Sequence, residues 1–272
     1  MFWKRALSSI VLIPVIILIV HWGTFLYSLL ICCVVLLMLV EFSQLSRSIG
    51  SKSHRAILLS SGLLFCLSAQ LHFSVELAFA FALFVAFADG ILRGQCDGTF
   101  LSITSTLTGG IYVGWAFGYH LLLLRQINDA VGHPVGGNLI FFLLVILWCG
   151  DIAAYLIGSK LGKHRLSPGI SPNKTIEGAA AGLFFGTIGG LVLWFFSLQG
   201  TLEIVHTVIL GVLLSITSQI SDLSESAIKR NAHVKDSGSI IPGHGGLLDR
   251  CDGLVFSAPV LYYYFQHLVN TV

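Results

Sequence analysis

The chain is 272 residues long, and only 10% of them are charged whereas 55% are hydrophobic. A soluble domain usually carries about 25% charged residues, so this composition excludes an ordinary water-soluble fold. The net charge of +2 provides no field that follows a phosphate backbone, which excludes a nucleic-acid binder. The same apolar composition excludes a disordered chain and a small secreted domain held by disulfides.

Three long stretches of the chain contain no charged residue, and they cover 6–40, 98–124 and 178–202. Each is long enough to cross a bilayer core of about 30 Å, which needs roughly 20 apolar residues. The sequence therefore predicts an all-α polytopic membrane protein. The apolar runs between charges and turn residues give nine expected spans, near 6–21, 24–41, 55–72, 73–89, 100–124, 138–158, 178–197, 203–222 and 253–270.

The positive charges fix the expected orientation of these spans. With a cytoplasmic N-terminus, every Lys and Arg except Arg125 lies in a cytoplasmic segment or at the inner end of a span. This distribution follows the positive-inside rule, and an error of one span in the middle would invert every later loop. We therefore expect a multi-pass protein of the cell's inner membrane with its C-terminus outside. The cytoplasmic loops are then 42–54, 90–99, 159–177 and 223–252.

Two of these loops differ from simple connections. Loops 159–177 and 223–252 are long and rich in Gly, Pro, Ser and charge, and the segment 222–252 holds five of the 13 acids and four of the 15 bases. The positive-inside rule explains the bases but not the carboxylates beside them. We therefore expect a set of N-terminal transmembrane helices over 1–140 and a catalytic region over 141–272.

The segment 221–230 continues the eighth expected span without Gly or Pro and is predicted to stay helical beyond the membrane surface. Asp222, Glu225, Ser226 and Lys229 then lie at i, i+3, i+4 and i+7, on one helix face. Such a face suits a metal–phosphate site, and the alternative is a surface ladder of ion pairs. Asp222 weakens that alternative because it lies where the helix leaves the hydrocarbon, and an ionisable group there is costly without a partner.

The segment 235–252 combines glycines with two further acids. Glycine lets a backbone approach a ligand closely and point its N–H groups at an anion, although a flexible linker is the alternative. Asp249 and Asp252 lie at i and i+3 with Arg250 between them. Carboxylates spaced in this way suit Mg²⁺ bridged to phosphates, and Arg can take phosphate oxygens bidentately. His244 is open to three readings, an acid–base group, a phosphate donor or a loop histidine.

The stretch 226–252 closely resembles the signature of the phosphatidate cytidylyltransferases, also called CDP-diacylglycerol synthases. It contains Lys-Arg at 229–230, Lys-Asp at 235–236, Pro-x-His-Gly-Gly at 242–246 and Asp-Arg-x-Asp at 249–252. The resemblance extends upstream to about residue 150 and includes Ser-Pro-Asn-Lys-Thr at 171–175. The family usually has Ser-Pro-Lys-Lys-Thr there, so Asn173 departs from the pattern, which leaves a phosphate contact at that position in question.

The resemblance implies that the protein converts CTP and phosphatidic acid to CDP-diacylglycerol and pyrophosphate at the inner membrane surface. It also implies Mg²⁺ held by Asp222 and Asp249 with support from Asp252, and it leaves a second cation open. The residues expected in catalysis are Asp222, Asp249, Asp252, Lys229, Arg250 and His244. The residues expected to bind substrate are Arg230, Lys235, Asp236, Gly243, Gly245, Gly246, Ser171, Lys174, Thr175 and Asp151.

Several alternatives stay open. A purely structural polar pair is the other reading of Asp151, which lies inside an expected span. A transporter would also have many spans, but its charges should cluster near the midplane rather than on one side. A CTP-dependent polyprenol kinase would share a nucleotide site and move the γ-phosphoryl group. The small residues at 178–182 allow close helix contact within one chain or in a homodimer.

Overall fold

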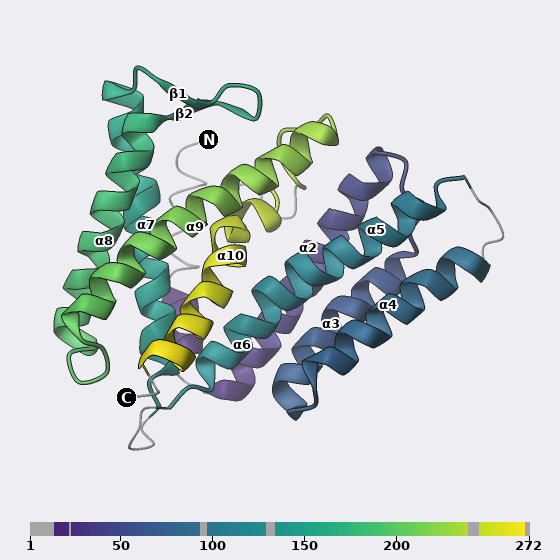
Figure 1. The fold of residues 1–272 in the computed structure, drawn as a ribbon, viewed down its shortest axis with the longest axis horizontal. Helices are drawn as coiled ribbons and strands as arrows, with labels where there is room; N and C mark the ends of the chain where they lie inside the picture. The colour runs from purple at the N-terminus through teal and green to yellow at the C-terminus, as the bar shows by residue number, and fades with distance from the viewer. Residues whose placement is uncertain (1–13, 22, 93–96, 129–133, 239–244, 270–272) are drawn as a thin grey trace. The chain divides into compact units, whose positions relative to one another are not determined.

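The computed structural model describes residues 14–21, 23–92, 97–128, 134–238 and 245–269. These residues are mainly helical, and the sheet that they contain is one two-stranded hairpin (Figure 1). Six of the described helices are long and apolar enough to cross a membrane. The predicted all-α polytopic membrane fold is therefore confirmed, whereas the count of nine spans and the sidedness of the termini stay predictions.

Helix covers every expected span from 24–41 onward. The helices are α2 (Thr24–Ser48), α3 (Arg55–Leu71), α4 (Val75–Leu92), α5 (Thr99–Gly109), η1 (Gly110–Tyr119), α6 (His120–Arg125), α7 (Gly136–Leu161), α8 (Ile176–Ser197), α9 (Ile204–Asn231), α10 (Leu248–Tyr264) and η2 (Phe265–Val269). The expected span 6–21 lies largely outside the described residues, with helix over 14–21. Since α9 ends at Asn231, the predicted continuation of the eighth helix through 221–230 is confirmed.

The chain forms two compact units, each assembled from two segments. Unit 1 comprises 1–123 and 228–251, and unit 2 comprises 124–227 and 252–272. The boundaries fall inside α6, α9 and α10, so the last turn of α9 and the first turn of α10 belong to unit 1. These units are defined by their internal contacts and do not test the predicted functional regions 1–140 and 141–272, which stay a prediction.

In unit 1, α3 contacts α2, α4, α5 and η1. The π-helix η1 approaches α3 closely because glycines recur at every fourth position. A Cβ atom on Gly114 would lie 2.6 Å from the Cα of Gly62, and one on Gly118 would lie 2.9 Å from the Sγ of Cys66. Large apolar side chains fill the rest of this interior, and Met38 and Phe65 have no exposed surface.

In unit 2, α7 and α8 form a close helix pair joined by the hairpin (Figure 1). The buried residues of α8 are all glycines, at 178, 182, 186, 189 and 190. Small residues let two helices approach until backbone meets backbone, which is how helices associate in membranes. A Cβ atom on Gly182 would lie 3.1 Å from the carbonyl oxygen of Gly150 on α7. The small-residue contact expected at 178–182 is therefore made within the chain, and a homodimer stays a prediction.

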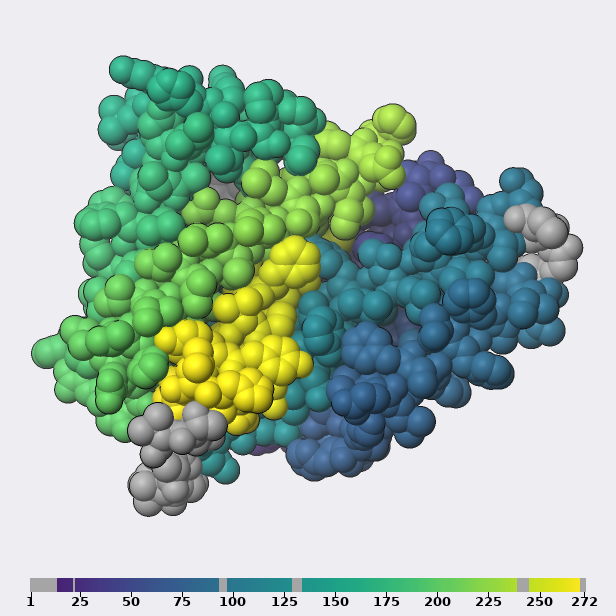
Figure 2. All heavy atoms as spheres, in the orientation of Figure 1, coloured from purple at the N-terminus to yellow at the C-terminus, as the bar shows by residue number. Residues whose placement is uncertain are grey.

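The hairpin was not predicted, because 159–177 was expected to be a loop. Its strands are β1 (Arg165–Ser167) and β2 (Ser171–Thr175), which pair antiparallel with Arg165 opposite Thr175. Thr175 ends the hairpin and begins α8, because its Oγ1 accepts a hydrogen bond of 3.2 Å from the N–H of Gly178. Figure 2 shows the hairpin at the surface of unit 2, beside the end of α8 that it caps.

The glycine contact between α7 and α8 predicts the effect of enlarging Gly178. A Cβ atom there would lie 2.8 Å from the carbonyl oxygen of Ala154, so Gly178→Val must push the helices apart. Overpacking of this kind costs about 1–3 kcal/mol, and we expect the midpoint of thermal unfolding in detergent to fall by about 5 °C. Gly200→Val is the control, because a Cβ atom on Gly200 meets nothing within 4 Å. Equal midpoints for both variants would contradict the close packing of α7 on α8.

Candidate active site

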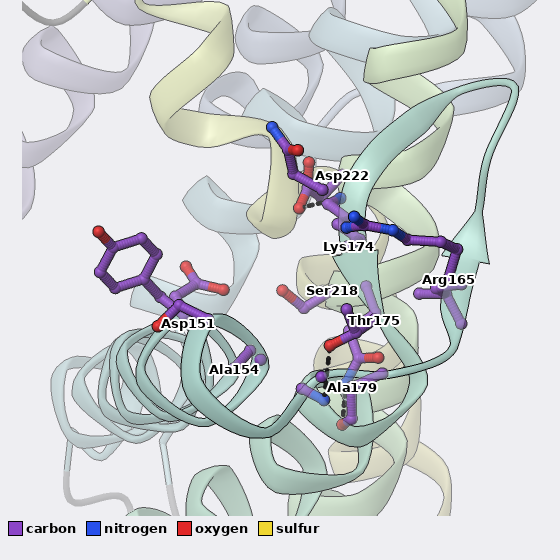
Figure 3. Close-up of a pocket in the computed structure, with 16 residues that line it drawn as sticks. Asp151, Ala154, Arg165, Lys174, Thr175, Ala179, Ser218 and Asp222 are labelled. Atoms are coloured by element: carbon purple, nitrogen blue, oxygen red, sulfur yellow. Dashed lines mark hydrogen bonds and ion pairs between the residues drawn. The ribbon is translucent and has the colours of Figure 1, made fainter.

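A cavity of about 640 Å³ opens in unit 2 between α7, the hairpin, α8 and α9. Figure 3 shows that α7, the hairpin and α9 bring charged and polar side chains to its walls, whereas α8 contributes small residues such as Ala179. Four of the residues expected in the site line it, namely Asp151, Lys174, Thr175 and Asp222. A volume of this size is in the range of small-molecule sites, and charged walls suit an ionic ligand.

An ion pair spans this cavity. The Nζ of Lys174, on β2, contacts the Oδ2 of Asp222, on α9. The two side chains are 28% and 36% exposed, and both line the cavity. Asp151 is exposed on α7, and its carboxylate is near enough to Asp222 and Lys174 for their charges to act on it. The cavity is therefore lined by two acids and two bases, Arg165 being the second base, and the charges of Asp151, Asp222 and Lys174 interact.

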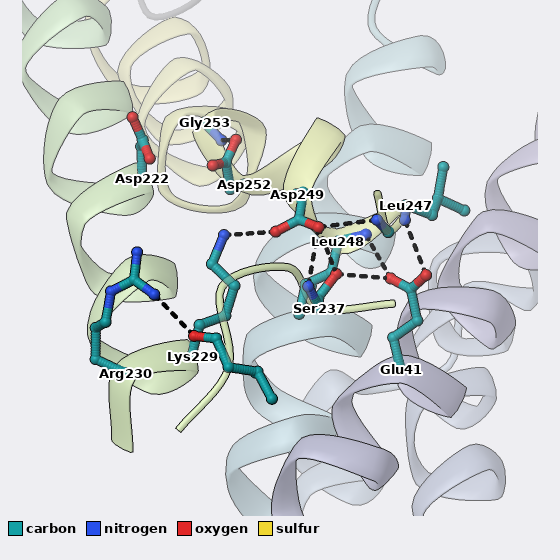
Figure 4. Close-up of polar contacts among 12 residues, drawn as sticks. Glu41, Asp222, Lys229, Arg230, Ser237, Leu247, Leu248, Asp249, Asp252 and Gly253 are labelled. Atoms are coloured by element: carbon teal, nitrogen blue, oxygen red, sulfur yellow. Dashed lines mark hydrogen bonds and ion pairs between the residues drawn. The ribbon is translucent and has the colours of Figure 1, made fainter. Parts of the chain in front are cut away.

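A third acid of unit 2 joins this group from α10. The charges of Asp222 and Glu225 act on the carboxylate of Asp252. The backbone of Asp252 is held in place because its carbonyl accepts a hydrogen bond from the Oγ of Ser221, and its carboxylate accepts one of 2.7 Å from the N–H of Gly253 (Figure 4). Acids this close repel one another unless a cation or a proton reduces their charge.

In unit 1, Asp249 accepts four hydrogen bonds from protein donors (Figure 4). Its Oδ1 accepts one of 2.5 Å from the Nζ of Lys229. Its Oδ2 accepts bonds of 2.9 Å from the N–H of Ser237, 3.1 Å from the Oγ of Ser237 and 2.8 Å from the N–H of Gly246. Lys229 and Asp249, both expected in catalysis, therefore contact each other directly.

Two opposing effects act on the pKa of Asp249. Burial of the carboxyl raises its pKa, whereas the hydrogen bonds from Lys229, Ser237 and Gly246 lower it. The hydrogen bonds and the Lys229 charge outweigh burial, so the pKa lies below its ordinary value. Asp249 is thus an ionised ligand or counter-ion at neutral pH.

The other expected residues that the structure describes are not part of the cavity lining. Arg230, Lys235, Asp236 and Arg250 are exposed, and Arg230 donates to the carbonyl oxygen of Val234 over 2.9 Å. Gly245 has a positive φ of 82°, which favours glycine. Ser171 lies on β2 but is not among the residues that line the cavity. The two remaining expected residues, Gly243 and His244, lie outside the described part of the chain.

Comparison with known proteins identifies the family. Residues 3–268 match the model of the cytidylyltransferase family. The chain belongs to this family. It is 34% identical to a phosphatidate cytidylyltransferase of Synechocystis sp. across 96% of this chain and 95% of the relative. It is 39% identical to the enzyme of that name from Bacillus subtilis, over 61% of this chain and 59% of the relative, and 48% identical to the one from Brucella suis, over 47% of each.

Sequence reasoning missed some residues of this cytidylyltransferase. Glu41 contacts the segment that holds Asp249. The sequence feature that could have indicated its importance is its position as the first acid after the uncharged stretch 6–40. Arg165 and Gln219 line the cavity, and Gln219 donates a hydrogen bond of 3.1 Å to the carbonyl oxygen of Ala179. Their positions in the sequence did not indicate a shared site, because the hairpin that carries Arg165 was not predicted.

The acids fit Mg²⁺ by their chemistry. Mg²⁺ takes oxygen ligands and needs only one or two carboxylates, because substrate phosphates and waters complete its shell. Asp222 and Asp252 supply such oxygens in unit 2. The Oδ1 of Asp249 accepts a hydrogen bond from Lys229, and an ionised carboxylate oxygen has acceptor capacity beyond one such bond. Among the described residues, no three His, Cys, Asp or Glu side chains form a metal cluster on their own.

The ion pair across the cavity predicts the effect of removing Lys174. Lys174→Met keeps the length of the side chain but removes the cation that faces Asp222, and we expect the apparent KM for CTP to rise about tenfold with a smaller change in kcat. Steady-state kinetics on the purified protein in lipid nanodiscs measure both constants. Lys163→Met is the matched control, since Lys163 is exposed on the same segment and does not line the cavity. Equal KM values in both variants would show that Lys174 does not bind substrate.

Proposed function

We propose that this chain transfers the cytidylyl group of CTP to phosphatidic acid and so forms CDP-diacylglycerol and pyrophosphate. The observation that carries the proposal is the match of the cytidylyltransferase family across residues 3–268. Relatives named phosphatidate cytidylyltransferase, one of them aligned over 96% of this chain, support the same substrates. The cavity of unit 2 supports the proposal independently, since Arg165 and Lys174 in its lining are cations that the phosphates of a nucleotide require in an otherwise apolar protein.

The proposed reaction needs charge neutralisation more than it needs a base. A phosphate oxygen of phosphatidic acid attacks the α-phosphorus of CTP, and the bond between that phosphorus and the bridging oxygen to the β-phosphate breaks. A phosphate monoester has its second pKa near 6, so the attacking oxygen is already largely ionised at pH 7. Two anions must then be brought together in line, which positioning and nearby cations achieve.

The bases of the site have this role in the proposal. Lys174, in the cavity wall, binds the triphosphate or the phosphate headgroup when either replaces Asp222 as its partner. Lys229 is held by Asp249 and keeps a positive charge beside that carboxylate. Arg250 is exposed at the first turn of α10, from where its planar guanidinium can take phosphate oxygens bidentately.

The acids hold the divalent cation in this proposal. Asp222 and Asp249 are its protein ligands and Asp252 supports them. Mg²⁺, when bound, supplies positive charge to the phosphate oxygens on which negative charge accumulates. A second cation and a homodimer stay predictions. The inner membrane as the location is also a proposal, which the distribution of Lys and Arg among the loops supports.

One labelling experiment separates this proposal from a CTP-dependent lipid kinase. The purified protein in nanodiscs is given phosphatidic acid, Mg²⁺ and CTP labelled at the α-phosphate or at the γ-phosphate. We expect α-label in the lipid extract and γ-label in water-soluble pyrophosphate, because the α-phosphoryl group is the one transferred. A control without phosphatidic acid should leave both labels in the aqueous phase.

Label from γ-labelled CTP in the lipid extract would instead identify a kinase. Absence of both labels from the lipid, with folded protein and a positive control enzyme, would refute the proposed reaction. A transporter reading predicts that absence, so the same experiment tests all three functions.

A further inference from the structure

The segment that carries Asp249 is tied to the N-terminal part of the chain by one buried acid. Glu41 lies on α2 and has no exposed surface. Its Oε2 accepts hydrogen bonds of 3.0 Å from the Oγ of Ser237 and 2.8 Å from the N–H of Leu248, and its Oε1 accepts one of 3.0 Å from the N–H of Leu247. All four residues belong to unit 1. Figure 4 shows Glu41 below these donors and Asp249 on their other side.

Two of these donors belong to the start of α10, which begins at Leu248. The first N–H groups of a helix have no partner within the helix and usually take one from a capping side chain nearby in sequence. Here the acceptor comes from another helix, more than 200 residues earlier in the chain. A carboxylate at a helix N-terminus is also favoured by the helix dipole. Glu41 therefore fixes where α10 begins, one residue before Asp249.

Glu41 also explains two of the loop glycines. A Cβ atom on Gly238 would lie 2.5 Å from the Oε1 of Glu41, and one on Gly246 would lie 2.6 Å from its Oε2. Real Cβ atoms do not come so close to an oxygen, so both positions need glycine while Glu41 is in place. The N–H of Gly246 in turn donates to Asp249. Gly246 thus packs against one acid and hydrogen-bonds another, and its role in phosphate binding stays a prediction.

Ser237 connects Glu41 to Asp249. Its hydroxyl lies 3.0 Å from the Oε2 of Glu41 and 3.1 Å from the Oδ2 of Asp249, and its N–H donates to the same Oδ2. A hydroxyl has a single proton to donate, so the two carboxylates share it. A change at Glu41 therefore alters the donor that faces Asp249 without touching Asp249 itself.

We propose that Glu41 is a positioning residue that sets Asp249 for its role, through Ser237 and through the first N–H groups of α10. The inference rests on the proposed function, because Asp249 acts there as a ligand of the divalent cation. Glu41 itself touches neither substrate nor metal in this proposal. Its effect is indirect, so a loss of Glu41 changes how well Asp249 is presented and leaves the cavity residues of unit 2 unaltered.

The test compares Glu41→Gln with the wild-type protein by two readouts. Glutamine keeps the size of the side chain but replaces one acceptor oxygen with an NH₂ group, which cannot accept from Ser237 or Leu248. Hydrogen–deuterium exchange of the protein without metal or nucleotide should be at least about tenfold faster in peptides that cover 236–238 and 246–250. In the activity assay, kcat should fall about tenfold and the Mg²⁺ concentration for half-maximal rate should rise, with less than a threefold change in the KM for CTP.

Glu76→Gln is the matched control, since Glu76 is an exposed acid in the first turn of α4. It should leave the exchange rates and the kinetics at wild-type values. Ser237→Ala removes the connecting hydroxyl, and adding Glu41→Gln to it should lower kcat by much less than tenfold if Glu41 acts through Ser237. If the losses of kcat caused by Ser237→Ala and Glu41→Gln are fully additive, Glu41 does not act through Ser237.

Wild-type exchange and wild-type Mg²⁺ dependence in Glu41→Gln would overturn the inference. If Glu41→Gln does not fold, Glu41→Asp is measured instead, because it keeps the carboxylate but shortens the side chain. Faster exchange at 246–250 in Glu41→Asp supports the inference, and wild-type exchange together with wild-type kcat overturns it. The exchange measurement does not depend on activity. If the wild-type protein makes no CDP-diacylglycerol, the proposed function is refuted, and the exchange measurement still tests the role of Glu41.

Discussion

A carboxylate that leaves water must be surrounded by donors or cations, and this requirement organises the polar part of an otherwise apolar chain. Asp249 meets it with Lys229 and three donors from Ser237 and Gly246. Glu41 meets it with Ser237 and the start of α10. Neither acid can be removed without leaving donors unpaired, and an unpaired buried donor costs about 1–3 kcal/mol. The arrangement of the loop before α10 follows from these two acids.

Close helix packing provides the second condition for the site. The glycine face of α8 lets α7 approach it closely, and the hairpin connects these two helices. Thr175 then ends the hairpin and caps α8, so Lys174 is fixed one residue before the helix begins. A short strand attached in this way can hold a lysine against Asp222 more firmly than a flexible loop would. The cavity of unit 2 is therefore a consequence of backbone packing as much as of its polar lining.

Much of this fold follows from the sequence alone. Long uncharged runs fix the helices, since a membrane span must satisfy its backbone hydrogen bonds internally. The helical continuation through 221–230 followed from the absence of Gly and Pro. These predictions depend on local composition, which a single sequence displays directly.

Other features could not be predicted because they depend on contacts between distant residues. Glu41 and Leu248 are far apart in the chain, and no periodic pattern joins one acid on a long apolar helix to two backbone N–H groups. The hairpin has strands of three and five residues around a Pro-Gly turn, too short to show an alternating pattern. The loop glycines were assigned to an anion because glycine alone indicates close approach without indicating what approaches. In unit 1, Glu41 approaches Gly238, and Ser237 and Glu41 both approach Gly246.

The central claim is that Asp222 and Asp249 bind a divalent cation to which the phosphate groups of the substrate also bind. Electron paramagnetic resonance of Mn²⁺, used in place of Mg²⁺, measures this directly on the purified protein in nanodiscs with and without CTP. The account predicts that CTP strengthens Mn²⁺ binding and that Asp222→Asn weakens the CTP-dependent binding by at least about tenfold. Asp97→Asn, which changes a fully exposed acid, should bind Mn²⁺ as the wild type does. Equal Mn²⁺ affinity in Asp222→Asn and the wild type, in the presence of CTP, would contradict the account.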